Sequence, residues 1–255
     1  MSENLSQKAY WHIHDKLTTG TLKPGFRLSN RAVAREVGIS FTPVREALNR
    51  LVSEGLLEYR EGLGVFVPQA SRREIEELYE VREMLECAVV VRACGRLPGA
   101  TLGEMRHLQD QMQIIVDLVD GTGRIAEHGE RFRELDSAFH LTLIRGTGNR
   151  QLLETVTDLR KKCAIKSGGE SGMAALIGHV FQTEPIESVQ RTCRDHDHLL
   201  ELLKDSSGEE EAGLLMGRHI RNGRQLALAA MERTYMSVTR RVTQPSYSAT
   251  ETSDA

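Results

Sequence analysis

The sequence predicts a mainly α protein: a small N-terminal domain of three helices and a β-hairpin, followed by an antiparallel all-helical bundle. Two observations predict this fold class. The first 70 residues contain three short amphipathic segments and then two strand-like runs around a glycine-bearing turn. From residue 72 to about residue 235 the apolar residues recur at helical spacing, Gly and Pro interrupt the pattern, and no strand-like alternation occurs.

The N-terminal domain begins with two predicted helices. The first covers residues 7–19, where the apolar spacing is helical. A turn at residues 22–25 contains Pro and Gly, and a second helix follows over residues 30–37. Ser29 or Asn30 can cap the N-terminus of the second helix and Gly38 can end it, because a glycine adopts the left-handed conformation required there.

A third helix and a hairpin complete this domain. The helix covers residues 42–54, with Ser40 as its cap and Pro43 in its first turn. The strands cover residues 56–60 and 62–67. Helix, helix, sharp turn, helix and hairpin is the order of a winged helix-turn-helix.

The remainder of the chain is predicted to be helical up to a polar tail. We place the domains at residues 1–70 and 71–235, and a disordered tail, rich in Ser and Thr, at residues 236–255. Residues 166–185 are ambiguous and include an apolar stretch at 174–180 that can form a helical turn. The predicted bundle helices cover residues 72–95, 101–119, 124–145, 149–166, 187–204 and 208–235.

Composition excludes some classes of protein and leaves others open. The 255 residues are 40% hydrophobic and 27% charged, enough apolar material for proper cores, and no run is long and apolar enough for a membrane span. The N-terminus lacks an apolar signal core, so we expect a cytoplasmic protein, and four scattered cysteines suggest reduced thiols. The net charge is −3, but the first 70 residues carry nine Lys or Arg against seven Asp or Glu. The N-terminal domain is therefore at +2 and the remainder at −5, the asymmetry expected of a DNA-binding head on an acidic body.

The third predicted helix has a polar face that suits DNA. Its outward residues are Arg45, Asn49 and Arg50, and Ser40, Phe41 and Thr42 lie at its start. A recognition helix presents its first turn to base edges, and arginine commonly pairs with guanine. Hydroxyl groups at a helix start suit phosphate. The pattern favours DNA reading, although a merely solvated face for Arg45 and Arg50 is equally consistent with the periodicity.

A set of residues with specific identities and spacing runs through residues 7–68. They are Gly20, Pro24-Gly25, Leu28, Arg31, Ala34, Gly38-Ile39-Ser40-Phe41-Thr42-Pro43-Val44-Arg45-Glu46-Ala47-Leu48, Leu51, Glu54-Gly55-Leu56 and Gly62-Leu63-Gly64-Val65-Phe66-Val67. In these residues the segment closely resembles the DNA-binding domain of the GntR family of bacterial transcription factors. The resemblance implies that Arg31, Ser40, Thr42, Arg45 and Gly62 lie at the family's DNA-contact positions. Phe41 departs from the family, which usually has Arg there, and this points to an altered operator preference or to contact with a thymine methyl group.

Four side chains in the body have the types and spacing of a metal site. Asp136 and His140 are four residues apart and so share a helix face beside an apolar stripe, and His196 and His219 each lie within an apolar stripe of another helix. Histidine with a carboxylate suits Zn²⁺ and other divalent transition metals. The alternative is that these are hydrogen-bonded core histidines. By contrast, His107, His128, His179 and His198 fall off the apolar faces.

The same four residues resemble those of the FCD effector-binding domain, found in the FadR subfamily of the GntR family. The similar residues are Leu78, Val81-Arg82, Leu85-Glu86, Asp136, Phe139-His140, Asn149, His196, Leu199-Leu200, Met216 and His219-Ile220, within residues 72–232. Many such domains bind a divalent metal through an Asp and three His, and others bind an acyl ligand without them. The resemblance thus implies a metal at Asp136, His140, His196 and His219, Zn²⁺ first, with Ni²⁺ or Mn²⁺ as alternatives.

These features predict a regulator rather than an enzyme. A metal with an open position invites a small carboxylate effector, and Arg82 is the candidate second cation, unless it forms a structural pair with Glu86. We interpret Asn149 as a helix cap. Reading a pseudo-palindromic duplex operator requires a homodimer, and the family resemblance favours repression relieved by an organic acid. A metal-dependent hydrolase and a sensor of the metal itself are the alternatives.

Overall fold

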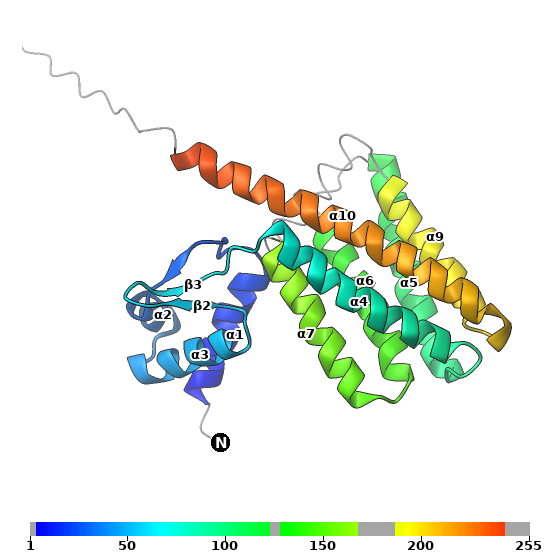
Figure 1. The fold of residues 1–255 in the computed structure, drawn as a ribbon, viewed down its shortest axis with the longest axis horizontal. Helices are drawn as coiled ribbons and strands as arrows, with labels where there is room; N and C mark the ends of the chain where they lie inside the picture. The colour runs from blue at the N-terminus through cyan, green and yellow to red at the C-terminus, as the bar shows by residue number, and fades with distance from the viewer. Residues whose placement is uncertain (1–3, 123–127, 168–186, 243–255) are drawn as a thin grey trace, which may run out of the picture.

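The computed structural model of the chain describes residues 4–122, 128–167 and 187–242. Figure 1 shows the N-terminal elements gathered at one end of the molecule and a set of long helices at the other. Each part has its own hydrophobic core. The predicted fold class is confirmed: a winged helix-turn-helix head precedes an antiparallel helical bundle.

The head consists of three helices and a small sheet. The helices are α1 (Leu5–Thr18), α2 (Asn30–Val37) and α3 (Phe41–Ser53), and the strands are β1 (Arg27–Leu28), β2 (Glu58–Arg60) and β3 (Gly64–Phe66). Ser29 caps α2 by accepting a hydrogen bond from the Ala32 backbone N–H, and Gly38 ends it at φ 73°. The structure thus selects Ser29 over Asn30, the other predicted cap, and confirms the predicted role of Gly38.

Strand β1 is an addition to the predicted hairpin. The sheet order is β1-β3-β2, entirely antiparallel, with Arg27 opposite Phe66 and Tyr59 opposite Val65. A strand of two residues is too short to show a period-2 pattern, so it could not be predicted from the sequence. Leu28 is the residue that β1 contributes to the head core.

The body is a bundle of long helices. Helix α10 packs along α4, and α5 packs against α6 and α9 (Figure 1). The core of the bundle includes Phe139, Leu143 and Ile144 of α6. Within the described ranges, every helix is too short or too polar to span a lipid bilayer. The elements are α4 (Arg72–Ala93), α5 (Gly99–Thr122), α6 (Gly129–Gly146), α7 (Arg150–Lys166), α9 (Glu187–Leu202), the 3₁₀ turn η1 (Ser206–Gly208) and α10 (Glu209–Val242).

Two predicted helix boundaries need correction. The helix placed at 124–145 begins at Gly129, with His128 as the residue before it. Helix α10 continues to Val242, so the tail does not begin at 236. The apolar stretch at 174–180 and the tail residues 243–255 lie outside the described residues.

Candidate functional site

The segment predicted to read DNA lies on the surface of the head. Helix α3 buries one face, and Ser40, Thr42 and Arg45 are exposed. Ser40 occupies the N-cap position, as predicted, but its side chain makes no capping hydrogen bond. Both the hydroxyl of Ser40 and the first N–H groups of α3 are therefore left to other partners, as at helix N-termini that bind phosphate.

The other two family positions are also exposed. Arg31 lies in the first turn of α2. Gly62 lies in the turn between β2 and β3 at φ 70°, a conformation that disfavours any residue with a Cβ atom. Phe41 is exposed at the start of α3, where contact of its apolar ring with water is unfavourable.

Arg50 is exposed on α3, but its guanidinium is held by contacts to other residues of the head. Its Nε donates to Glu54 Oε1 at 2.9 Å, and its guanidinium lies 4.2 Å from the centre of the Tyr10 ring. The Tyr10 hydroxyl donates to the other oxygen of Glu54 at 2.6 Å. Burial, reinforced by this hydrogen bond to a carboxylate, raises the pKa of Tyr10 to about 12. The network ties α1 to the end of α3, a structural role that periodicity could not distinguish from DNA contact.

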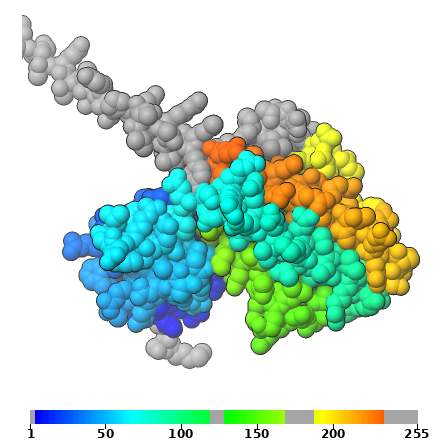
Figure 2. All heavy atoms as spheres, viewed as in Figure 1, coloured from blue at the N-terminus to red at the C-terminus, as the bar shows by residue number. Residues whose placement is uncertain are grey.

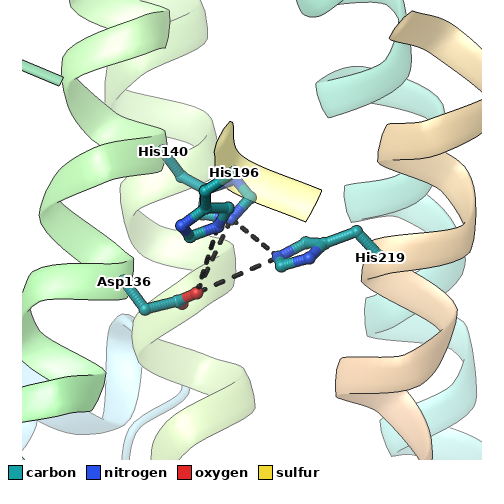
Figure 3. Close-up of side chains that lie close together, drawn as sticks. All are labelled: Asp136, His140, His196 and His219. Atoms are coloured by element: carbon teal, nitrogen blue, oxygen red, sulfur yellow. Dashed lines mark hydrogen bonds and ion pairs between the residues drawn. The ribbon is translucent and has the colours of Figure 1, made fainter. Parts of the chain in front are cut away.

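The four side chains predicted as metal ligands meet in the core of the body. Asp136 and His140 project from α6, His196 from α9 and His219 from α10 (Figure 3). Asp136 Oδ1 lies 3.9 Å from His140 Nε2, 3.6 Å from His196 Nε2 and 3.9 Å from His219 Nε2. One donor atom from each residue falls within 4.8 Å of all the others. Donors on three helices that converge to this degree can hold one metal ion.

His196 provides an independent test of whether these residues fit a metal. Its side chain is 0% exposed, and neither ring nitrogen has a hydrogen-bond partner among the described residues. The ring stacks on Phe139 with centroids 4.0 Å apart. A buried polar atom without a partner is costly, so an unpartnered imidazole nitrogen beside a carboxylate and two other imidazoles fits a metal ligand.

A second layer of carboxylates lies behind two of the histidines. Glu86 Oε2 is 2.8 Å from His140 Nδ1, and Asp195 Oδ2 is 3.5 Å from His219 Nδ1. A carboxylate within hydrogen-bond distance of Nδ1, as Glu86 is for His140, favours the tautomer that leaves Nε2 to face the cluster. From the sequence, Glu86 was predicted as a partner of Arg82 and as one of the residues similar to FCD domains, but not as a partner of His140. Asp195 was not singled out, although it is adjacent to His196.

Arginines balance these buried carboxylates. Arg160 of α7 donates to Asp136 Oδ2 at 3.0 Å and to Glu86 Oε2 at 3.1 Å. Arg82 Nε donates to Glu86 Oε1 at 2.9 Å. Burial favours the protonated form of Glu86, but Arg82 and Arg160 outweigh it and hold the pKa of Glu86 well below its ordinary value. The carboxylate behind His140 is therefore ionised.

The protonation states of the cluster suit metal binding. Burial, followed by the charge of Arg160, lowers the pKa of His140 to about 4. Burial, followed by the neighbouring His219, holds the pKa of His196 well below its ordinary value. Burial opposes ionisation of Asp136, but the nearby His140 and Arg160 prevail and lower its pKa. A metal needs neutral imidazoles and an ionised carboxylate, and these groups meet that need at neutral pH.

A cavity of about 340 Å³ adjoins the cluster, and Asp136 and His219 form part of its wall. Four arginines line it (Arg82, Arg133, Arg160 and Arg191), together with three carboxylates (Asp136, Glu187 and Asp195). Arg82 is buried, with its guanidinium 4.8 Å from the centre of the Tyr79 ring. Its pairing with Glu86 and its place on the cavity wall are both present, so the two interpretations of Arg82 are compatible.

The remaining residues singled out in the sequence lie apart from the cluster. Asn149 caps α7 as expected by accepting a hydrogen bond from the Leu152 N–H. His107 contacts Gln111, and His198 pairs with Glu211 on the surface. His179 lies outside the described residues. All four cysteines are free.

Fold and site together define a class of protein, a transcriptional regulator that reads DNA through a winged helix-turn-helix. The family model described as "Bacterial regulatory proteins, gntR family" matches residues 5–67, and the one described as "FCD domain" matches residues 77–222. The chain therefore belongs to the GntR family of regulators that carry an FCD domain. The enzymatic alternative, a metal-dependent hydrolase, has no support from these matches, since the first describes regulatory proteins and neither describes an enzyme.

Curated relatives are regulators as well. The chain is 38% identical to the HTH-type transcriptional regulator McbR of Escherichia coli over 101 residues, 40% of this chain and 46% of that protein. It is 35% identical to the Nta operon transcriptional regulator of Aminobacter aminovorans over 140 residues, 55% of this chain and 62% of the relative. It is 26% identical to the regulator LutR of Bacillus subtilis over 216 residues, 78% and 91% of the two chains. The chain thus spans less than two thirds of the first two relatives.

Solved structures share the fold. E. coli McbR/YncC has a TM-score of 0.59 and 23% identity, with 95% of this chain and 100% of that chain covered. A putative GntR transcriptional regulator from Rhodococcus sp. RHA1 has a TM-score of 0.63 and 22% identity, with 88% and 98% covered. At these identities the likeness extends to the fold alone.

Proposed function

We propose that the protein is a ligand-responsive transcriptional repressor, released from its operator when a small carboxylate binds beside a divalent metal held by Asp136, His140, His196 and His219. The observation that carries this proposal is the buried His196, whose ring nitrogens have no hydrogen-bond partner among the described residues, within a cluster at the wall of an arginine-lined cavity. A DNA-binding head on the same chain supplies the output.

The donor set supports Zn²⁺, with Ni²⁺ or Mn²⁺ as alternatives. Three imidazoles and one carboxylate are ligands that all three ions accept. When bound, the metal would supply a positive charge to which an oxygen atom of the effector's carboxylate can bind.

Charge supports an anionic effector. The four arginines of the cavity wall exceed its three carboxylates by one, and Glu86 behind the wall cancels that excess. A divalent cation at the cluster therefore leaves a net positive pocket, which an organic acid neutralises. Arg82, on the cavity wall, is the residue we assign to the effector's second polar group.

For DNA we assign contacts to five exposed positions in the head: Arg31, Ser40, Thr42, Arg45 and Gly62. Two recognition helices one DNA turn apart read a pseudo-palindrome, so the active form is a homodimer. Apolar contact between Phe41 and a thymine methyl group distinguishes this head from relatives with Arg at that position.

The test is a gel-shift titration of metal-loaded protein on duplexes tiled across the DNA upstream of its gene. We expect one duplex to bind preferentially, with an affinity that falls steeply with added salt. We also expect one member of a panel of small carboxylic acids to weaken that complex. Uniform binding to all duplexes contradicts the regulator, and indifference to every acid contradicts the effector.

A second candidate function is sensing of the metal itself. If Asp136, His140, His196 and His219 all bound one zinc ion, they would satisfy its usual four-ligand requirement without any effector. In that case operator affinity changes when a chelator removes the metal and no organic acid is present. An unchanged affinity under these conditions leaves the metal as an anchor for the effector.

A further inference from the structure

Helix α7 contacts both the candidate metal site and the DNA-binding head. Its middle carries Arg160, whose side chain is 10% exposed and whose guanidinium bonds to both Asp136 and Glu86. Arg160 thus contacts a candidate metal ligand directly and reaches a second ligand, His140, through the carboxylate of Glu86. Arg160 also donates to Ser137 Oγ of α6 at 3.4 Å. A displacement of Asp136 therefore moves its hydrogen-bond partner Arg160 and, with it, α7.

The C-terminal turn of α7 belongs to the head. Ile165 is 4% exposed and, among the described residues, is the only one from beyond Val67 in the hydrophobic core of the head. Helix α7 also contacts α1. The side chain of Lys162 lies against Gly55, with its Cε about 3.8 Å from where a Cβ would stand, just past the end of α3. From Arg160 to Ile165 is about 7.5 Å along a helix.

The start of α4 is fastened to the same end of α7. Lys166 Nζ donates to Glu74 Oε1 at 2.9 Å, and Glu74 forms the capping box of α4 with Ser71. Helix α4 carries Glu86 and follows directly from the head. Helix α4, which carries Glu86, and helix α7, which carries Arg160, therefore meet at one junction with the head.

We infer that α7 transmits the metal-bound or metal-free state of the candidate site to the DNA-binding head. Arg160 is the positioning residue that connects the site to α7. This inference rests on the proposed metal site. Packed helices shift as rigid bodies, so a small movement of Asp136 and Glu86, which Arg160 contacts from the middle of α7, displaces the core contact of Ile165 in the last turn of that helix. Because Arg160 bonds to both carboxylates, it responds to either of them.

The test is amide hydrogen exchange of the full chain with and without Zn²⁺, followed at residues 5–18 and 41–53 of the head. In the wild type we expect exchange in these segments to change about 5-fold or more on zinc binding, the lower range of typical coupling between sites. Arg160→Gln removes the connection but none of the four ligands, so zinc should still bind while the head no longer responds. Arg160→Lys keeps a charge that cannot span both carboxylates and should respond only weakly.

Two further variants guard against a merely structural effect. Ile165→Ala acts at the head end of α7, away from the ligands, and should likewise abolish the response while zinc affinity is unchanged. Arg150→Gln alters an 83% exposed arginine at the other end of α7 and should keep the wild-type response. If Arg160→Gln does not fold, Ile165→Ala decides.

The outcomes separate the inference from the function beneath it. Zinc bound to the wild type with an unresponsive head, or a head that responds equally in Arg160→Gln, overturns the inference alone. A wild-type protein that binds no metal, by titration and elemental analysis, overturns the proposed metal site and the inference with it.

Discussion

Glu86 and His140 face one another across the contact between α4 and α6, with Oε2 of the carboxylate 2.8 Å from Nδ1 of the imidazole and both side chains 1% exposed. This pair directs His140 Nε2 toward Asp136. Second-layer carboxylates orient histidine ligands and increase their basicity. The pair therefore contributes to the metal site although Glu86 is not itself placed to be a ligand.

Glu86→Gln should weaken zinc binding by about 10- to 100-fold, the usual effect of losing a second-layer partner. Competition with a chromogenic chelator, on protein shown to be folded by circular dichroism, measures the affinity. The matched control is Glu83→Gln, one turn earlier on α4, because Glu83 pairs with Arg221 and does not reach the cluster. Equal zinc affinity in Glu86→Gln and the wild type would mean that the pair only supports packing.

Replacing His196 should separate metal binding from stability. His196→Leu removes two ring nitrogens that have no hydrogen-bond partner among the described residues, each costing about 1–3 kcal/mol when left unsatisfied. The metal-free variant should therefore be at least as stable as the metal-free wild type in urea unfolding, while zinc no longer raises its melting temperature. His198→Leu, on the exposed side of the same helix, should keep the zinc effect. A strongly destabilised His196→Leu would argue for a core histidine instead of a ligand.

Sequence patterns predicted that the four candidate ligands point into the bundle interior, but they did not predict the residues around them. Asp136 and His140 could be placed on one face because a helix fixes residues four apart, whatever it packs against. Glu86 and Arg160 are on helices α4 and α7, and their contact with the cluster depends on which helices become neighbours. Nothing in the spacing within one helix reports that arrangement.

The head shows the same division. Ser29 and Gly38 end α2 as predicted, because capping is a local property. Strand β1 was missed because it depends on pairing with β3, nearly forty residues later. Arg50 could not be distinguished from Arg45 by periodicity, because both lie on the exposed side of α3, and only the fold brings Tyr10 beneath Arg50.

Acidification should destabilise the metal-free protein. The pKa of His140 is lowered to about 4 by burial, so between the ordinary histidine pKa and that value the unfolded chain binds a proton that the folded chain excludes. Stability is therefore present above about pH 6.5 and lost as the pH falls toward 4, by about 2 kcal/mol at pH 5 for His140 alone. The lowered pKa of His196 acts in the same direction.

Urea unfolding at pH 7, 6 and 5 measures this loss. His196→Leu should show a shallower dependence, since one of the two buried histidines is gone, whereas His198→Leu should follow the wild type. The low pKa of Asp136 affects stability only at lower pH, because a carboxyl group is ionised in both states across this range. A stability that does not change between pH 7 and pH 5 would contradict neutral burial of these histidines.

Replacing Arg45 by alanine should lower operator affinity, whereas replacing Arg50 by alanine should lower the stability of the fold. Arg45 is exposed on α3 and has no ion pair within the described part of the chain, so Arg45→Ala should cost about 1–3 kcal/mol of operator binding with little change in stability. Arg50 stacks on Tyr10 and pairs with Glu54, so Arg50→Ala should lower the urea concentration at the midpoint of unfolding slightly and leave operator affinity near that of the wild type. Fluorescence anisotropy with a labelled operator duplex and urea unfolding of the same preparations measure the two quantities. If Arg50→Ala loses as much operator affinity as Arg45→Ala, then Arg50 leaves Glu54 to contact DNA, and the assignment of a structural role to Arg50 is wrong.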